Sequence, residues 1–462
     1  MIESERVRCL NEAPVDEDGR YVLYWMQQSQ REAHNPALEH AIRRGNELGK
    51  PVLCGFGLYA DYPDANLRHF AFMLDGLAET AAALADRGIK LLGRYGSPPQ
   101  VIAELARDAA LVVCDRGYLR HQRNWRDEVA GSCDVSVEQV EGDVVVPIEV
   151  VSDKQEYAAR TIRSKINRHR DDFIRTLKRE RPGKSSLLLR VSGDIDFRRP
   201  ANVLEKLDID RSVGKSARFE AGTKAAQRAL RRFLSHDLDG YADARNDPAK
   251  PQASRLSPYL HFGQISPVEI ALKVGRAESG SADDKDAFLE ELIVRRELAM
   301  NFVYFCDDYD KYGCLPDWAL RTLKEHRDDP RSDTYTRQQL ENADTHDAYW
   351  NAAMQEMLKT GYMHNYMRMY WGKKVIEWTN TPEYAYSTLL YLNNKYFLDG
   401  RDPNSYTGVA WIFGLHDRAW AERDVFGKIR YMNASGLESK FDIKAYVEWV
   451  ESLQERNSRI GH

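Results

Sequence analysis

Cysteine is scarce in this chain of 462 residues. No two cysteines form a Cys-x-x-Cys pair, and none stands beside histidines at the spacing of a metal ligand set. A zinc site is therefore not expected, and the chain is predicted to work in a reducing compartment. The six cysteines are Cys9, Cys54, Cys114, Cys133, Cys306 and Cys314.

Long hydrophobic runs are missing as well. No stretch approaches the roughly 20 apolar residues that span a bilayer, and the charged opening MIESERVRC differs from a secretory signal. We expect no membrane contact, with a cytoplasmic location in a prokaryote and a nuclear location as the alternative in a eukaryote. The 66 basic and 71 acidic residues leave a net charge of only −5. Any nucleic-acid surface must therefore be a local basic patch.

What the first third of the chain has is alternation. Between residues 21 and 147, short apolar runs such as YVLYW and ALVVCD are separated by amphipathic segments of helical period. This pattern is typical of βαβ units and a mainly parallel sheet. The run GFGLYA at residues 55–60 spells a dinucleotide fingerprint, but Asp-Tyr-Pro-Asp follows it in place of a helix start. We therefore do not interpret it as a nucleotide site.

The predicted fold class is α/β followed by all-α. Residues 1–150 are expected to form a Rossmann-like, doubly wound parallel sheet. Residues 151–221 begin with a basic segment that breaks at Pro182-Gly183, and they are interpreted as an inter-domain linker. Residues 222–462 are dominated by helical periodicity and are predicted to form an all-helical domain.

The helical domain is predicted to centre on residues 361–378, GYMHNYMRMYWGKKVIEW. Its methionines, tyrosines and tryptophans recur at steps of three and four residues and share one face. A polar, glycine-punctuated run follows at residues 391–411. A hydrophobic helix beside such a loop is how a cofactor pocket is often built. The plain alternative is a buried helix whose aromatic side chains are only core.

Four motifs are more specific than this general pattern. They are ASRLSPYLHFGQIS (253–266), FLEELIVRREL (288–298), MHNYMRMYW (363–371) and LDGRDPNSY (398–406), with VFGKIRYMN (425–433) behind them. Together they resemble the class II cyclobutane pyrimidine dimer photolyases, in the photolyase/cryptochrome family. The resemblance implies a monomeric deoxyribodipyrimidine photo-lyase. Excited, reduced anionic FAD would pass an electron to a flipped-out dimer in DNA and so split the cyclobutane ring.

The resemblance also implies the contacts to FAD. Serine hydroxyls ahead of Pro258, where a helix should begin, suit a pyrophosphate; a simple helix cap is the alternative. Arg368 and Asp399 match the family's ion pair against the flavin ring, and Asn393 is preferred over Asn404 for the contact to flavin N5. The full set is Tyr241, Ser254, Arg255, Leu256, Ser257, Arg368, Asn393, Asp399, Gly400, Arg401 and Asn404.

Three tryptophans, Trp350, Trp371 and Trp378, match the family's electron relay, through which an oxidised flavin is photoreduced; core packing is the alternative. Trp318, Trp420 and Trp449 are assigned to packing. An antenna chromophore, a deazaflavin or a folate, could occupy the N-terminal domain; the sequence reveals neither its presence nor its identity.

For the lesion, the resemblance implies three contacts. Glu291 would hydrogen-bond the dimer, Trp411 would pack against it, and Met369 would lie between dimer and flavin. Relatives specific for the (6-4) photoproduct carry histidines at the positions of Asn365 and Met369. Two departures stand out: Arg295 occupies a place where some members carry a second tryptophan, and Met300 interrupts a polar run.

A basic cluster follows the lesion residues and is predicted to contact phosphates. A solvated charged face is the alternative, because acidic residues interleave. The cluster comprises Arg418, Arg423, Lys428 and Arg430, with Arg295 at the lesion itself. The competing function is a cryptochrome-like photoreceptor with flavin but no repair, which the presence of Glu291, Met369 and Trp411 argues against.

Overall fold

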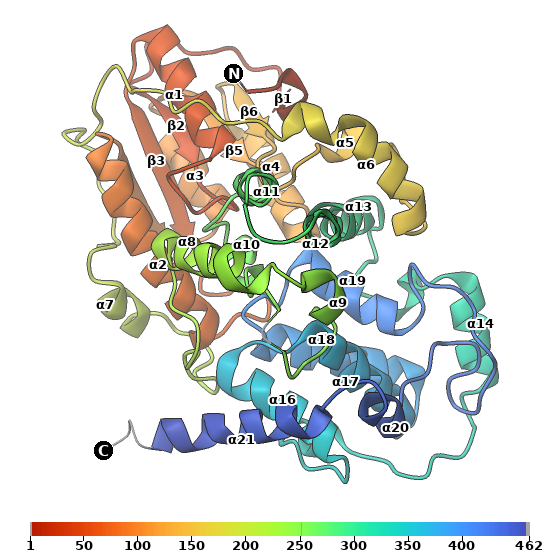
Figure 1. Ribbon diagram of the computed structural model, residues 1–462. Coiled ribbons are helices and arrows are strands. Elements are labelled where there is room, and N and C mark those ends of the chain that lie inside the picture. The colour runs from red at the N-terminus through yellow and green to blue at the C-terminus, as the bar shows by residue number, and fades with distance from the viewer. Residues whose placement is uncertain (1, 251, 459–462) are drawn as a thin grey trace.

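A computed structural model describes residues 2–250 and 252–458. Its first part is one six-stranded sheet with the order β1-β6-β5-β2-β3-β4, in which only β1 runs antiparallel (Figure 1). From β2 the chain adds β3 and β4 toward one edge of the sheet, and it then crosses back to add β5 and β6 on the other side of β2. The carboxyl ends of β2 and β5 therefore form a topological switch point, where open α/β sheets bind ligands. The strands are β1 (Val7–Cys9), β2 (Tyr21–Trp25), β3 (Val52–Leu58), β4 (Lys90–Tyr95), β5 (Ala109–Asp115) and β6 (Val137–Val140).

Strand β2 is buried along its whole length because helices cover both faces of the sheet. Val22 and Tyr24 belong to the core beneath α1 (Pro36–Leu48) and α2 (Leu67–Asp86). The other residues of β2, which alternate with these two, face the opposite core, beneath α3 (Pro98–Ala106) and α4 (Arg120–Ser132). This is the period-two alternation of a strand. Figure 1 shows this α/β part above and to the left of the helical part.

Residues 148–205 connect the two parts. Helix α6 (Ala159–Phe173) buries Ile162, Ile166 and Phe173 in the core of the helical part. Helix α7 (Pro200–Glu205) instead adds Leu204 to the core beneath α2. The connection is thus packed against both parts. The connecting segment begins with α5 (Ile148–Val151), directly before α6. The 3-10 turn η1 (Ser4–Arg6) lies at the start of the chain, before β1.

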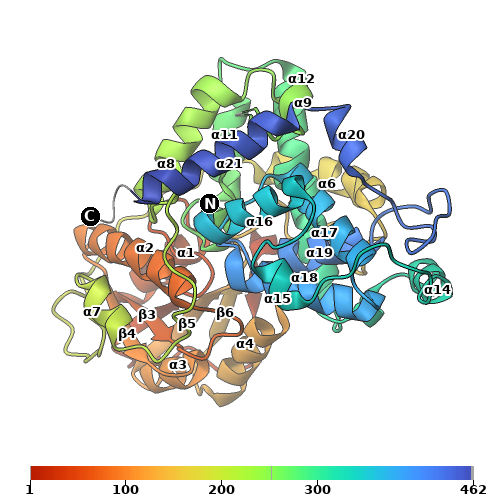
Figure 2. The ribbon, with the colours of Figure 1, turned by 90° about the horizontal axis from the view of Figure 1, so that it is seen from below.

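The helical part is built around α17, which contacts α16, α18 and α19 (Figure 2). Its helices are α8 (Thr223–Arg232), α9 (Tyr241–Ala244), α10 (Ser257–His261), α11 (Pro267–Gly275), α12 (Ala282–Leu289), α13 (Arg296–Phe305), α14 (Asp317–Glu325), α15 (Arg337–Glu341), α16 (Ala348–Thr360), α17 (Asn365–Trp378), α18 (Pro382–Tyr396), α19 (Pro403–Ile412), α20 (Ala434–Glu438) and α21 (Ile443–Ser458), with the π-helical turns η2 (Phe233–Asp237) and η3 (Glu290–Arg295) and the 3-10 turn η4 (Tyr312–Cys314).

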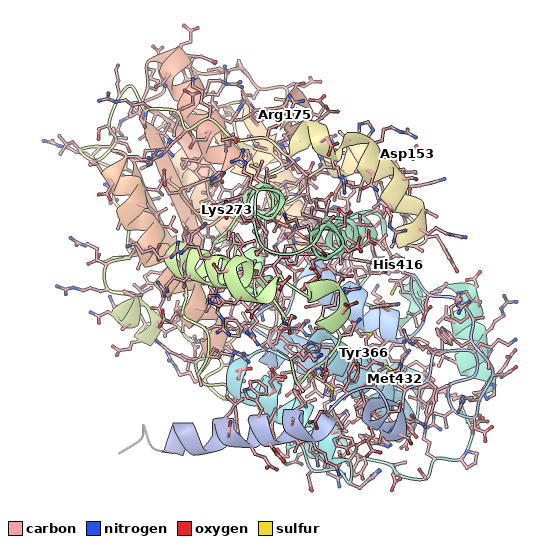
Figure 3. All side chains as sticks on the ribbon, viewed as in Figure 1. Asp153, Arg175, Lys273, Tyr366, His416 and Met432 are labelled. Carbon is pink, nitrogen blue, oxygen red and sulfur yellow. The ribbon has the colours of Figure 1, made fainter. Side chains whose placement is uncertain are left out.

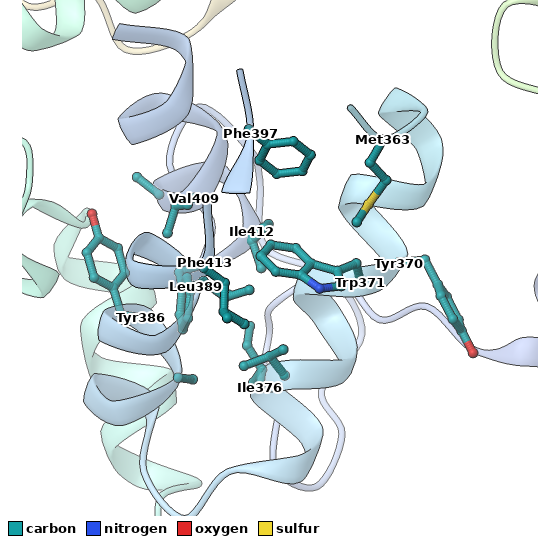
Figure 4. Close-up of a cluster of buried hydrophobic side chains, with 14 of the residues drawn as sticks. Met363, Tyr370, Trp371, Ile376, Tyr386, Leu389, Phe397, Val409, Ile412 and Phe413 are labelled. Atoms are coloured by element: carbon teal, nitrogen blue, oxygen red, sulfur yellow. The ribbon is translucent and has the colours of Figure 1, made fainter. Parts of the chain in front are cut away.

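The central helix begins four residues later than predicted. Gly361 has φ +73° and ends α16 in the left-handed conformation, where glycine has no steric penalty. His364 then caps α17, with its Nδ1 accepting the backbone N–H of Tyr366 at 3.3 Å. The prediction that His364 lies within the helix was therefore wrong. Figure 4 shows Trp371 of this helix inside the buried cluster, with Phe397 and Ile412 nearby.

The predicted architecture, a parallel α/β sheet followed by an all-helical part, is confirmed. Among the described helices, none has both the length and the apolar character needed to cross a membrane. Within residues 2–250 and 252–458, no group of three or more His, Cys, Asp or Glu side chains is placed to hold a metal ion.

Candidate active site

Two cavities meet at the N-terminal end of α17. The first, here called the tryptophan-lined cavity, has a volume of about 1200 Å³ and contains the side chains of Trp371 and Trp411. The second, the serine-lined cavity, has a volume of about 1070 Å³ and is bordered by Ser254 and Ser257. They adjoin and share part of their wall, which consists of Arg245, Asn246, Glu291, Asn365, Arg368 and Asn404.

Arg368 and Asp399 form an ion pair at this junction. The Nη2 of Arg368 lies 3.1 and 3.0 Å from the two carboxylate oxygens of Asp399, whose side chain is only 8% exposed. The guanidinium also stacks 4.0 Å from the ring centroid of Phe397. Such a fixed, largely desolvated pair presents a cation of defined orientation to the cavity.

The predicted phosphate contacts lie together along the serine-lined cavity, where Tyr241, Ser254, Arg255, Leu256 and Ser257 all form its wall. Arg255 has φ +54°, and its buried Nε has no hydrogen-bond partner among the described residues. Burial, with the nearby charge of Glu291, raises the pKa of Tyr241 and keeps its phenol neutral. Helix α10 begins at Ser257, as predicted, but it has only five residues, so its dipole contributes little.

The two asparagines that compete for flavin N5 differ in their surroundings. Asn393 is buried on α18 and lines the tryptophan-lined cavity, with its Nδ2 donating to Asn394 Oδ1 at 3.0 Å. Asn404 is exposed and lines both cavities, and its Nδ2 donates to Asp402 Oδ1 at 2.8 Å. Asn393 is therefore in the more enclosed position, and its side-chain carbonyl oxygen has no hydrogen-bond partner among the described residues.

Gly400 and Arg401, two predicted cofactor contacts, line neither cavity. A Cβ on Gly400 would lie 2.8 Å from the carbonyl oxygen of Asn393, so glycine is needed there for close packing against α18. Arg401 has φ +60° and donates to the carbonyl oxygen of Asn394 at 2.9 Å. Its side chain borders a different cavity, at the carboxyl end of β2. The walls of the two cavities give these two assignments no support, and both stay predictions.

The three predicted relay tryptophans form a row that leaves the tryptophan-lined cavity. Trp371 lines the cavity, and the Nε1 of Trp350 donates to the carbonyl oxygen of Trp371 at 2.9 Å. The ring centroids of Trp350 and Trp378 are 5.6 Å apart. Trp378 is itself only 1% exposed, and Tyr335 packs on it with a centroid distance of 5.3 Å. The row therefore ends beneath Tyr335 and does not itself reach solvent.

The predicted lesion residues line the same cavity as Trp371: Glu291, Met369, Trp411 and Arg295 all belong to its wall. Glu291 and Arg295 stand on η3, a π-helical turn between α12 and α13. Such turns are frequent at functional sites. Glu291 pairs with Arg245 at 2.7 Å.

The departures from the family pattern have different surroundings. Arg295 pairs with Glu290 at 3.3 Å, and Arg163 of α6 binds the same carboxylate at 2.7 Å. A guanidinium is thus held at the place of the second tryptophan. Met300 is fully buried in the largest core cluster, so an apolar side chain fits its position.

The basic cluster lies on a hairpin-like loop after α19. Arg418, Arg423 and Lys428 are exposed, and Arg430 is partly buried beside Trp411 in a small cavity. Trp420 is 39% exposed, with the guanidinium groups of Arg418 and Arg430 lying 5.1 and 5.2 Å from its ring centroid. Trp420 was assigned to packing, which was wrong. Its flanking by arginines in a polar segment was the available signal.

This loop is fastened to the segment after α14. The backbone N–H of Val425 donates to Asp329 Oδ2 at 2.9 Å. His326 lies between Asp329 (2.6 Å) and Glu422 (3.1 Å), and hydrogen bonds to Glu422 and then Asp329 raise the pKa of this histidine. The basic side chains are therefore presented by a held loop and not by a free tail.

Two cavity residues were missed from the sequence. Arg245 gave no signal beyond its place in the loop before the serine motif, yet it holds Glu291. His416 lines the tryptophan-lined cavity, and its Nδ1 donates to the carbonyl oxygen of Tyr157 at 2.7 Å. Burial lowers the pKa of His416 to about 4, so it is neutral at pH 7. Figure 3 shows His416 on the same side of the helical part as Tyr366 and Met432.

Known proteins resemble this chain over nearly all of it. Residues 22–183 match the protein family described as DNA photolyase. A protein of Methanothermobacter thermautotrophicus named deoxyribodipyrimidine photo-lyase is 49% identical over 460 residues, which cover 98% of this chain and 100% of that protein. A protein of the same name from Potorous tridactylus is 37% identical over 450 residues, covering 96% and 84%.

Solved structures share the fold at lower identity. A bacterial class III photolyase from Agrobacterium tumefaciens gives a TM-score of 0.71 at 18% identity, covering 94% of this chain and 86% of that one. A cryptochrome of Synechocystis sp. PCC6803 gives 0.73 at 17% identity, covering 93% and 88%. At these identities the likeness concerns the fold alone.

Proposed function

This chain belongs to the DNA photolyase family, and from that premise we propose how its adjoining cavities carry out the light-driven repair of cyclobutane pyrimidine dimers. The activity is that of a deoxyribodipyrimidine photo-lyase. One observation supports our assignment above all others. The Arg368–Asp399 pair, Glu291 and Trp411 come from four separate segments of the chain and meet around two adjoining cavities.

The donor set of the serine-lined cavity fits FAD, the cofactor of this family. Serine hydroxyls and the incompletely bonded guanidinium of Arg255 suit a pyrophosphate. The cation of Arg368, held by Asp399, suits the negative charge of a reduced flavin ring. Bound reduced FAD, excited by blue light, supplies the electron that opens the cyclobutane ring. We assign Asn393 to the flavin ring, because its oxygen is free and enclosed.

The tryptophan-lined cavity is the proposed lesion site. Its apolar wall of Trp411 and Met369 excludes water from two flipped bases, whose extrusion costs a few kcal/mol and least for a damaged pair. Glu291, oriented by Arg245, accepts from the base edge, and Arg295 stacks on a base face. The exposed Arg418, Arg423, Lys428 and Trp420 and the partly buried Arg430 contact the surrounding DNA.

A third cavity, of about 780 Å³, is the proposed antenna site. It lies where β2 and β3 end, next to the switch point between β2 and β5, and is lined by Trp25, Phe56 and Tyr62. His261 and Arg401 close it from the helical part. A flat chromophore such as a deazaflavin or a folate suits these aromatic walls.

The experiment that tests the proposed function is done on the purified protein. Flavin absorption bands are expected, and blue light should restore monomeric pyrimidines in a dimer-containing oligonucleotide. An additional absorption band would identify the antenna chromophore. Flavin bands without any dimer splitting would instead favour a photoreceptor.

Glu291→Ala should lower repair per absorbed photon several-fold more than it lowers binding of dimer-containing DNA. The Glu291 hydrogen bond matters most after the dimer has gained an electron. Both quantities are measured by titration and by actinometry on one preparation. Glu291→Gln is the matched control, because it keeps the shape and a hydrogen-bonding oxygen. Equal losses in both quantities for Glu291→Ala would indicate a structural role.

Arg430→Gln should weaken dimer-containing and intact DNA about equally. If Arg430 neutralises one phosphate, the slope of log affinity against log salt should fall by about one unit. Arg198→Gln is the control, because Arg198 is exposed on the α/β part and pairs with Asp196. An unchanged salt slope in Arg430→Gln would remove the phosphate assignment.

A further inference from the structure

A buried lysine of another helix binds the last carbonyl group of α19, the helix that carries Trp411. In the last turn of α19, the carbonyl oxygen of Ala410 accepts from the backbone N–H of Phe413 at 3.0 Å, and that of Trp411 accepts from Gly414 at 3.0 Å. The carbonyl oxygen of Ile412 has no backbone donor among the described residues. It accepts instead from the Nζ of Lys373, on α17.

The contact depends on a close crossing of α17 and α19. A Cβ on Gly372 would lie 2.1 Å from Cδ1 of Ile412, so a larger residue at position 372 would force the Ile412 side chain to move at this crossing. The next residue, Lys373, is 2% exposed and reaches across this crossing. Figure 4 shows Ile412 lying against the helix that carries Trp371.

A buried ammonium group is costly, so its presence needs a reason. Burial lowers the pKa of Lys373 to about 7; Asp417 opposes this shift and Arg430 adds to it. A methionine would fill a similar volume without this cost. What the amine provides is a donor for a helix-terminal carbonyl, which carries partial negative charge.

The surroundings of Lys373 connect it to the lesion site. Lys373 lines a cavity of about 680 Å³ together with Asn365, Met369 and Trp411, all of which also line the tryptophan-lined cavity. Trp411 and Ile412 are consecutive, so the carbonyl that Lys373 binds is one residue beyond the indole. Any fraying of the last turn of α19 would move that indole.

We propose that Lys373 is a positioning residue for Trp411: by binding the Ile412 carbonyl, it fixes the last turn of α19 and so the indole wall of the lesion site. The inference rests on the proposed function, in which Trp411 packs against the dimer. Lys373 itself need not touch the DNA.

The test is a double-mutant cycle on the FAD-containing protein, with Lys373→Met, Trp411→Phe and the double variant. The preference for a dimer-containing oligonucleotide over an intact one should fall about tenfold in Lys373→Met, in the range for loss of one buried hydrogen bond. The double variant should lose no more than Trp411→Phe alone, because the lysine acts through the indole. Fully additive losses would overturn the proposal.

A second readout does not depend on DNA. The fluorescence of Trp411 is isolated as the difference between proteins with and without Trp411→Phe, and its quenching by acrylamide is measured. Quenching should increase in Lys373→Met and stay unchanged in Lys374→Met. Lys374 is a matched control, since it is also buried on α17 but pairs with Glu377 at 2.8 Å. Unchanged quenching in Lys373→Met would contradict the proposal.

The two failures can be told apart. If the wild-type protein does not distinguish damaged from intact DNA, the proposed function fails, while the quenching result still decides the role of Lys373. If Lys373→Met does not fold, Lys373→Arg takes its place in the cycle and in the quenching series. The longer guanidinium must displace the crossing, so both readouts should shift in the same direction but less. No shift in either readout would overturn the proposal.

Discussion

Trp371→Phe should stop photoreduction of bound, oxidised FAD by an external donor. Trp371 is the relay residue that lines the tryptophan-lined cavity, and its carbonyl oxygen is bonded to Trp350. Phenylalanine keeps a buried aromatic ring but is much harder to oxidise than an indole. The expected rate of flavin reduction under blue light therefore falls to that of the dark control. Absorption spectroscopy during illumination measures it.

Repair by chemically pre-reduced Trp371→Phe enzyme should survive, because that reaction takes no electron from the protein. This comparison separates loss of the relay from loss of folding. Trp449→Phe is the control, since Trp449 lies outside the row and packs near Tyr446 and Arg218. Normal photoreduction in Trp371→Phe would remove the relay assignment, and loss of both reactions would show that the variant is misfolded.

The enzyme should repair cyclobutane dimers and leave (6-4) photoproducts unrepaired. Reversing the (6-4) product moves a hydroxyl group between bases and needs a proton donor, for which histidine suits neutral pH. Asn365 and Met369 stand where relatives specific for that lesion carry histidines, and neither can exchange a proton at pH 7.

The structure adds two histidines to this argument. His364 borders the serine-lined cavity and His416 the tryptophan-lined cavity, and burial lowers the pKa of each to about 4. Both pKa values lie below the ordinary value for histidine, so both rings are neutral at pH 7 and would become acids only near pH 4. Their Nδ1 atoms are also engaged, with Tyr366 and Tyr157 respectively.

The measurement uses duplexes that carry each lesion, illuminated with reduced enzyme and analysed by chromatography. Restored bases are expected from the cyclobutane duplex only. The cyclobutane duplex itself is the control for active enzyme. Repair of the (6-4) duplex at a comparable rate would contradict the assignment of Met369 and Asn365.

Much of the fold was predictable because it depends on periodicity. The buried runs YVLYW and ALVVCD could only be strands of a sheet covered on both faces, and the structure has them as β2 and β5. The boundary of α17 was not predictable in the same way. Glycine at position 361 fits the end of one helix as well as the approach to another, and only the observed φ of +73° decides.

The candidate site was less readable, because neighbours in sequence can point to different cavities. Asp399 lines the serine-lined cavity, whereas Arg401, two residues later, borders the cavity beside the sheet. A left-handed φ at a non-glycine residue produces this turn, and sequence gives little warning of it. The π-helical turn that carries Glu291 is similar, since ordinary helix formers occupy it. Trp420 was misassigned because burial, and not residue type, separates a packing indole from an exposed one.

Arg68 of helix α2 couples the folding of the α/β part to that of the helical part. Its buried guanidinium donates to the carbonyl oxygens of Met357 (3.1 Å), Leu358 (2.5 Å) and Tyr396 (2.7 Å), at the ends of the two helices that flank α17. Without Arg68 these carbonyls would lose a donor supplied from outside the helical part. The last turns of α16 and α18 therefore reach their full set of hydrogen bonds only when α2 has already folded. During synthesis the α/β part emerges first, so it is already in place as a template when the later helices form. Melting of the two parts should accordingly be coupled into one transition.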